Sequence, residues 1–177
     1  MALTLLTLFF GTLLLGGCMS VKPGSTKSGK HYFETFYVGA EGTQYFIRPL
    51  LFENHEASNV LALDITFRYK DEIRDSAVIN FSIKSLEIFK SVDSLKITNS
   101  LMDIKSDNID LLFNEKFNKG FVSRFTTKVP LDKMKNIFDN DEWELIIYNT
   151  TKSNTYEPHR KTQKAVNSLR ENVFILM

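Results

Sequence analysis

A single thiol stands at the end of the most apolar segment of the chain. From Ala2 to Leu15 the residues are leucine, phenylalanine, threonine, alanine and one glycine, without a charged side chain. Gly16 and Gly17 follow, and then Cys18, which is the only cysteine of the sequence. A thiol is a nucleophile that can be alkylated. Glycines lack a Cβ, so an enzyme can approach the backbone beside this thiol closely.

The sequence Leu15-Gly16-Gly17-Cys18 resembles the lipobox of bacterial lipoproteins. The resemblance implies that a diacylglycerol is attached to the Cys18 sulfur, that the chain is cut before Cys18, and that the new amino group is acylated. Two or more acyl chains give stable membrane anchoring where one is reversible. In the enterobacterial sorting rule, Asp directly after the cysteine retains a lipoprotein in the inner membrane. Met19 stands there, which implies the outer membrane.

The apolar segment suits the core of a signal peptide and is shorter than the roughly 20 apolar residues of a membrane span. The alternative is a retained N-terminal anchor helix in which the cysteine has no role. We therefore expect residues 1–17 to be a lipoprotein signal peptide, residues 18–30 to be a lipidated cysteine with a flexible tether, and residues 31–177 to be a single β-rich domain. With no cysteine after Cys18, this domain must be stable without disulfides.

Alternation of apolar and polar residues dominates the chain after His31. In the clearest example, Leu61 to Tyr69, every second residue is large and apolar, which predicts a strand with one buried face. Similar patterns predict strands at Tyr32–Val38, Thr43–Phe52, Ile79–Ile83, Leu86–Phe89, Leu95–Thr98, Ile109–Phe113, Phe121–Val129 and Trp143–Tyr148. Many short strands with little helix between them predict a mainly β fold: an antiparallel β-sandwich or a partly open barrel.

Helical periodicity occurs in two places. Pro130 begins a segment whose apolar residues share one face, which predicts a short capping helix. A second helix is expected from near Pro158, with Ala165, Val166 and Leu169 facing the body. Its other face is basic and is a candidate contact for lipid headgroups or an acidic partner, although such faces are usually only solvated. That face carries Arg160, Lys161, Lys164 and Arg170. The apolar residues 173–177 predict a last strand or a plug against the core.

The residues give little support for catalysis, and we expect no enzymatic activity, no cofactor and no metal. His31, His55 and His159 show no metal-ligand spacing. Gly24, Gly29 and Lys30 match the glycine and lysine spacing of a phosphate-binding loop, but His31 replaces the required Ser or Thr, so no nucleotide is expected. The acidic residues around Asn140 favour ordinary turn chemistry over a calcium site. They are Asp139, Asp141, Glu142 and Glu144.

Two functions remain open at this point. The formal net charge of +1 argues against a dedicated nucleic-acid binder, which would be markedly basic. The first candidate is a non-enzymatic structural or protein-interaction module of the cell envelope, acting in a secretion or assembly system and binding an envelope protein through sheet faces or edge strands. The alternative is a carrier that holds an apolar ligand in an aromatic-lined barrel or sandwich.

Overall fold

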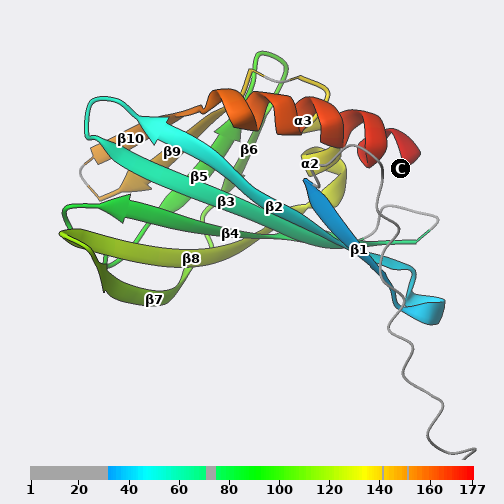
Figure 1. Ribbon diagram of the computed structural model, residues 1–177, viewed down its shortest axis with the longest axis horizontal. Coiled ribbons are helices and arrows are strands. Elements are labelled where there is room, and N and C mark those ends of the chain that lie inside the picture. The colour runs from blue at the N-terminus through cyan, green and yellow to red at the C-terminus, as the bar shows by residue number, and fades with distance from the viewer. Residues whose placement is uncertain (1–31, 71–74, 141, 151) are drawn as a thin grey trace, which may run out of the picture.

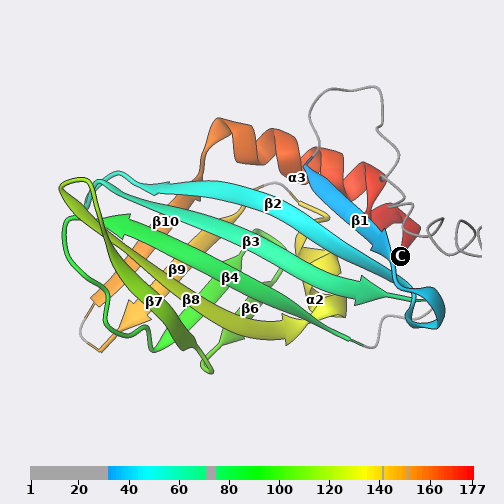
Figure 2. The ribbon, with the colours of Figure 1, turned by 60° about the horizontal axis from the view of Figure 1, so that its bottom comes forward.

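The fold is a single antiparallel sheet that curls into a partly open barrel (Figures 1 and 2). The computed structural model describes residues 32–70, 75–140, 142–150 and 152–177. In these ranges nine of the ten strands follow the order β6-β5-β9-β10-β2-β3-β4-β8-β7, and the tenth, β1, pairs with β2. The strands are β1 (Phe33–Tyr37), β2 (Thr43–Asn54), β3 (Asn59–Tyr69), β4 (Ser76–Ser85), β5 (Ser94–Thr98), β6 (Asp103–Ser106), β7 (Asp110–Phe117), β8 (Gly120–Pro130), β9 (Glu144–Asn149) and β10 (Lys152–Pro158). The predicted mainly β, antiparallel fold is confirmed.

The predicted alternation places the core on the inner face of the sheet. In β3, Leu61, Leu63 and Ile65 are fully buried, while the residues between them are half-buried on the outer face. Strand β4 is the antiparallel return of β3, with Leu63 opposite Phe81. The curl brings β6 against β8, where the hydroxyls of Ser106 and Thr127 are hydrogen-bonded. One face of a continuous sheet therefore encloses most of the core.

Two helices complete the barrel. The first, α2 (Leu131–Ile137), buries Leu131, Met134 and Ile137 at one end, as its periodicity predicted. The second, α3 (Arg160–Asn172), runs along β2. Thr162 fixes it there, because its Oγ1 donates to Leu51 O at 2.6 Å and accepts from Leu51 N at 2.8 Å. A short 3-10 turn, η2 (Gly39–Glu41), links β1 to β2.

A row of stacked aromatic rings fills the interior beneath α3. Phe52 stacks on Trp143 at 6.4 Å between centroids, and Trp143 meets Phe138 edge-on at 4.6 Å. Phe138 stacks on Phe174 at 4.1 Å, and Phe174 on Phe67 at 5.6 Å. Phe174 begins the last 3-10 turn, η3 (Phe174–Leu176). Residues 173–177 were predicted to form either a last strand or a plug against the core. The structure shows the plug.

Three details of the expected strand pattern need correction. Residues 86–89 form no strand, because both edges of β4 are already paired and the chain turns away where Ser85 Oγ donates to Glu87 O. Strand β6 was missed because it has only four residues. Strand β10 was missed because Tyr156 is its one fully buried side chain, so it shows no apolar alternation.

Tyr156 gives a testable dependence of stability on pH. Its ring is fully buried and its hydroxyl has no hydrogen-bond partner among the described residues. Burial raises the pKa of Tyr156 to about 12, and the nearby Asn59 side chain opposes this rise. In the unfolded chain the phenol ionises near pH ~10, so its stabilising contribution is complete below that pH and is lost as the pH rises through the folded value.

We expect wild type to lose about 2 kcal/mol more than Tyr156→Phe between about pH 9 and about pH 12. At neutral pH the variant should be as stable as wild type or slightly more stable, because it lacks an unpaired buried hydroxyl. Urea midpoints of both proteins at the two pH values measure this difference. If the urea midpoints of the two proteins changed in parallel with pH, this loss of stability could not be assigned to Tyr156.

Candidate protein-interaction edge

Strand β7 lies at one margin of the sheet and exposes large apolar side chains (Figures 1 and 2). In the part of the chain that the structure describes, β8 is the one strand that pairs with it. The exposed fractions are 42% for Leu111, 50% for Leu112, 42% for Phe113 and 46% for Phe117. An edge strand of this kind presents unpaired N–H and C=O groups together with apolar surface. We name these four side chains and the free backbone edge beside them the β7 edge.

Local sequence explains the tight hairpin that joins β7 to β8. Asn118 has a φ of 53°, a left-handed conformation that Asn tolerates well, and it begins the tight turn from β7 to β8. Gly120 follows, and a Cβ on it would stand 2.3 Å from Ser85 O, so only glycine allows this close approach. The same approach brings Leu86, which is 77% exposed, beside the end of the hairpin. The apolar surface therefore continues from Phe117 toward Leu86.

An ordered charged network borders the β7 edge on the outer face of the sheet. The Arg124 guanidinium donates through Nη2 to both carboxylate oxygens of Asp64, at 2.8 and 3.1 Å, and through Nη1 to Ser82 Oγ at 2.9 Å. Its side chain is 27% exposed and that of Asp64 is 19% exposed. Arg124 lies opposite Phe113 in the strand register. Arginine and aromatic side chains that are fixed in this way are common anchors of protein interfaces.

Charge and irregularity limit how β7 can be paired. The register shifts between Leu111 and Phe113, so Leu112 forms a bulge. Glu115 and Lys116 are exposed on the strand, and Lys84 Nζ lies 5.1 Å from the centroid of the Phe117 ring. Bulges and charges of this kind prevent indiscriminate edge pairing. A partner would therefore need matching charges as well as apolar side chains.

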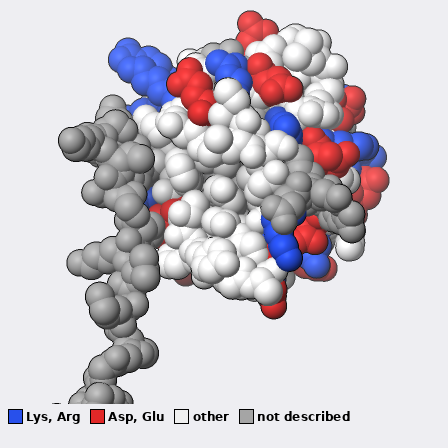
Figure 3. Space-filling view, turned by 90° about the vertical axis from the view of Figure 1, so that its right-hand side faces the viewer, with Lys and Arg blue, Asp and Glu red and all other residues white. Residues whose placement is uncertain are grey.

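The other strand edges are less suited to docking. The short β6 is held against β8 by Ser106, whose hydroxyl meets that of Thr127. Strand β1 has five residues and exposes Phe36 and Tyr37. It belongs to the end of the barrel that also carries the C-terminus, and the middle of that end is largely uncharged (Figure 3). Strand β7 is longer than either and exposes more apolar side chains.

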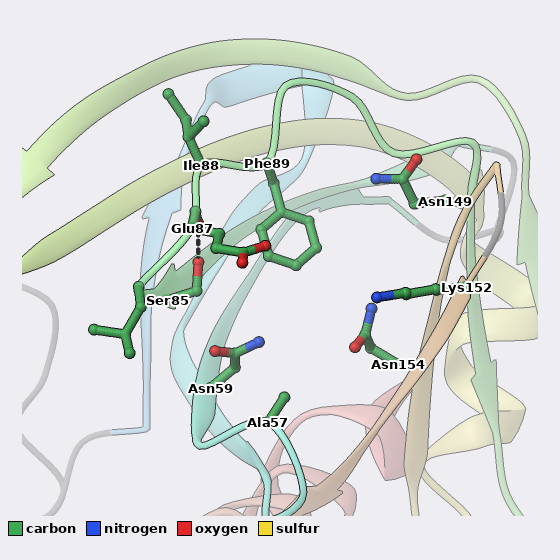
Figure 4. A pocket seen from close by; sticks show the side chains of 10 residues that line it. Ala57, Asn59, Ser85, Glu87, Ile88, Phe89, Asn149, Lys152 and Asn154 are labelled. Carbon is green, nitrogen blue, oxygen red and sulfur yellow. Dashed lines mark hydrogen bonds between the residues drawn. The ribbon is translucent and has the colours of Figure 1, made fainter.

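A hollow of about 400 Å³ lies at the end of the barrel where β4 ends (Figure 4). Glu87 and Lys152 extend into it from facing walls, with Asn59 and Asn154 below and the Phe89 ring above. No ion pair joins Glu87 to Lys152 in the structure that the described residues form. Both charged side chains are exposed. The hollow is thus lined mainly by polar and charged side chains, unlike the apolar cavity that a carrier requires.

The structure places some of the predicted site residues and omits others. Cys18, His31 and Asp141 lie outside the described residues. His55 is exposed in the turn between β2 and β3, whereas His159 caps α3 by accepting a hydrogen bond from Lys161 N through Nδ1 at 3.2 Å. The two described histidines therefore lie on different elements, His55 in a turn and His159 at the start of α3.

The turn at Asn140 has the local hydrogen bonds that its composition predicted. Asn140 Oδ1 accepts from Glu142 N at 2.8 Å, its Nδ2 lies 2.6 Å from Ser100 Oγ, and its carbonyl accepts from Trp143 Nε1 at 2.7 Å. Among the residues with described positions, no three His, Cys, Asp or Glu side chains gather as a metal site.

The basic face of α3 is smaller than the sequence suggested. Arg160, Lys161 and Lys164 are exposed. Arg170 is half-buried and donates to Asp139 O at 3.1 Å and to Asn167 Oδ1 at 2.8 Å, so it joins the helix to the turn after α2. The expectation that all four cations project freely is wrong for Arg170. None of the helices in the described ranges is both long and apolar enough to cross a bilayer.

Sequence reasoning predicted a strand at Ile109–Phe113 but did not single it out as a site. The available signal was the run Leu111-Leu112-Phe113, which breaks the alternation seen in β3 and β8. Comparisons with protein-family models, with curated proteins and with solved structures found no match to this chain. The candidate site is therefore defined by geometry alone.

Proposed function

We propose that this chain is a lipid-anchored protein of the bacterial envelope, attached through Cys18 to the outer membrane, that acts as a non-enzymatic interaction module. The β7 edge is the docking surface, and the partner is another envelope protein. The observation that carries the proposal is the combination of a free strand edge with four large exposed apolar side chains on β7.

Strand addition supplies the binding chemistry. The free N–H and C=O groups of β7 would pair with an extended segment of the partner, and main-chain hydrogen bonds would give affinity. Phe113 and Phe117 lie on one face of β7 and would meet alternate apolar side chains of the partner. Glu115 and Lys116 would select a partner with complementary charges.

The carrier alternative has weaker support. Its apolar ligand would need interior space, and the stacked row from Phe52 to Phe67 occupies the interior beneath α3. The hollow at the barrel end is bordered by Glu87 and Lys152, whose hydration would be lost under an apolar ligand. The filled interior favours the interaction module.

The docking proposal predicts that Phe113→Lys combined with Phe117→Lys abolishes the complex with the partner. Both side chains are close to half exposed and a lysine stem can cover the same surface, so the free energy of unfolding should fall by about 1 kcal/mol at most. Native electrophoresis of membranes extracted in mild detergent would show the protein shifting from a larger complex to its own mass.

The matched control is Leu101→Lys combined with Leu176→Lys, two exposed apolar positions outside β7, with exposed fractions of 70% and 69%. This variant should keep the complex. If the β7 variant also kept it, or if both variants lost it equally, docking on β7 would be refuted.

A further inference from the structure

The first turns of α3 carry an uncompensated cluster of positive charge. Arg160, Lys161 and Lys164 are exposed, and none of their side chains forms an ion pair or hydrogen bond in the described structure. No acidic residue lies in the first turn. The amino end of a helix is itself electropositive, so cations there are unfavourable and anions are favoured. We name these three residues the α3 basic cluster.

The α3 basic cluster surrounds a hollow of about 580 Å³ together with His159 and Tyr32. Three acidic side chains belong to the neighbouring strands β1, β2 and β10. Glu53 Oε1 lies 4.0 Å from His159 Nε2, and Glu34 is engaged by Arg48 at 2.9 Å. Glu157 is exposed at the end of β10 without an ion pair among the described residues. The described lining of the hollow itself contains three cations and no acidic residue.

The hollow also lies where the segment that contains Cys18 joins the domain. Tyr32 is the first described residue, and 13 residues from Met19 to His31 separate it from Cys18 in the sequence. At roughly 3.4 Å per residue such a segment spans at most about 45 Å. It contains Lys22, Lys27 and Lys30 and no acidic residue. An anchor at Cys18 would thus keep the cluster near a membrane surface.

We infer that the α3 basic cluster binds the anionic phosphate headgroups of the membrane that holds the anchor. The inference rests on the proposed attachment at Cys18. Helix α3 and strand β7 lie on opposite sides of the curled sheet in both ribbon views (Figures 1 and 2). Contact through α3 would therefore turn the β7 edge away from the bilayer, toward a partner.

The test uses the full lipidated chain with Gln163→Cys. Gln163 is exposed between Lys161 and Lys164. Because the sulfur of Cys18, the single native cysteine, is blocked by its lipid, a thiol-reactive dye should label residue 163 alone. The protein is reconstituted into vesicles that carry a headgroup-linked quencher, with either phosphatidylglycerol or phosphatidylcholine as the main lipid. We expect strong quenching with phosphatidylglycerol and little with phosphatidylcholine.

Four controls make the result specific. Reversal of Arg160, Lys161 and Lys164 to Glu should remove the quenching, because each cation near an anionic surface contributes about fivefold and the three together about 100-fold. Reversal of Lys116, Lys119 and Lys128 to Glu changes the net charge equally on the β7–β8 hairpin and should leave the quenching unchanged. Salt of about 1 M, where the screening length is about 3 Å, should also remove it. A dye at Lys119→Cys, at the tip of the β7–β8 hairpin, should remain unquenched.

Equal quenching in the two lipids, or quenching that survives the α3 reversal, would overturn the inference. A different result would be that neither lipid quenches the dye and that an acidic protein which co-purifies with the wild type is lost in the α3 reversal. The cluster would then bind a protein partner instead of the membrane. Labelling of two thiols would refute lipidation at Cys18. The quenching comparison would then be made with Cys18→Ser held on nickel-lipid vesicles by an N-terminal histidine tag, where the same outcomes decide the inference.

Discussion

Exchange of Cys18 for Ser should abolish lipid attachment completely. The chain has no other thiol, and a serine hydroxyl is a far weaker nucleophile than a thiolate. We expect the variant to accumulate as an unprocessed precursor or as a protein released from the membrane fraction. Metabolic labelling with fatty acid, followed by fractionation of the envelope, measures both effects.

A second variant tests whether the position of the thiol matters. Cys18→Ser combined with Ser20→Cys restores a thiol two residues later, where Gly16 and Gly17 no longer precede it directly. The proposed processing requires that neighbourhood, so this variant should remain unlabelled. Incorporation of fatty acid into either variant would refute attachment at Cys18 and would favour a retained N-terminal anchor helix.

The largest loss of stability is expected for Trp143→Ala. Trp143 is 1% exposed and packs between Phe52 and Phe138, and its Nε1 donates to Asn140 O at 2.7 Å. Removal of the ring would leave a cavity in the row of aromatic rings and free a carbonyl, at a cost of about 3–5 kcal/mol. Domains of this kind are stable by only about 5–15 kcal/mol, so the variant should be close to unfolding.

Urea unfolding followed by circular dichroism measures this loss, because Trp143 is the only tryptophan and its fluorescence disappears in the variant. Trp143→Phe, which keeps a ring in the site, should lose clearly less. A loss below about 1 kcal/mol for the alanine variant would show that the aromatic row does not hold the barrel together.

The fold class could be predicted because burial of one sheet face leaves a period of two in the sequence. Strands β3, β4 and β8 are each paired along both edges and show this period clearly. Strand β10 could not be found in this way. Tyr156 is its one fully buried side chain, so the strand shows no alternation of apolar and polar residues. The sequence also could not decide between a sandwich and a barrel. That choice depends on the contact of β6 with β8, two strands that lie far apart in the sheet order.

The candidate site was harder to predict than the fold. A strand near residues 109–113 was expected, but its position at the margin is decided by which strands pair, and pairing is a tertiary property. The basic face of α3 was predicted from periodicity, yet Arg170 proved to be held by Asp139 O, a contact between segments 31 residues apart. Exposure of Arg160, Lys161 and Lys164 followed from the helical period alone.

The most direct test of the proposed docking is photo-crosslinking from residue 112 in living cells. A photoreactive amino acid in place of Leu112, which is half exposed at the bulge of β7, should give one discrete adduct with an envelope protein. The same amino acid in place of Leu101, which is more exposed but lies outside β7, should give none. An adduct of twice the mass of the chain would identify the occupant as a second copy. Absence of any adduct at residue 112, or equal adducts at both positions, would contradict the account.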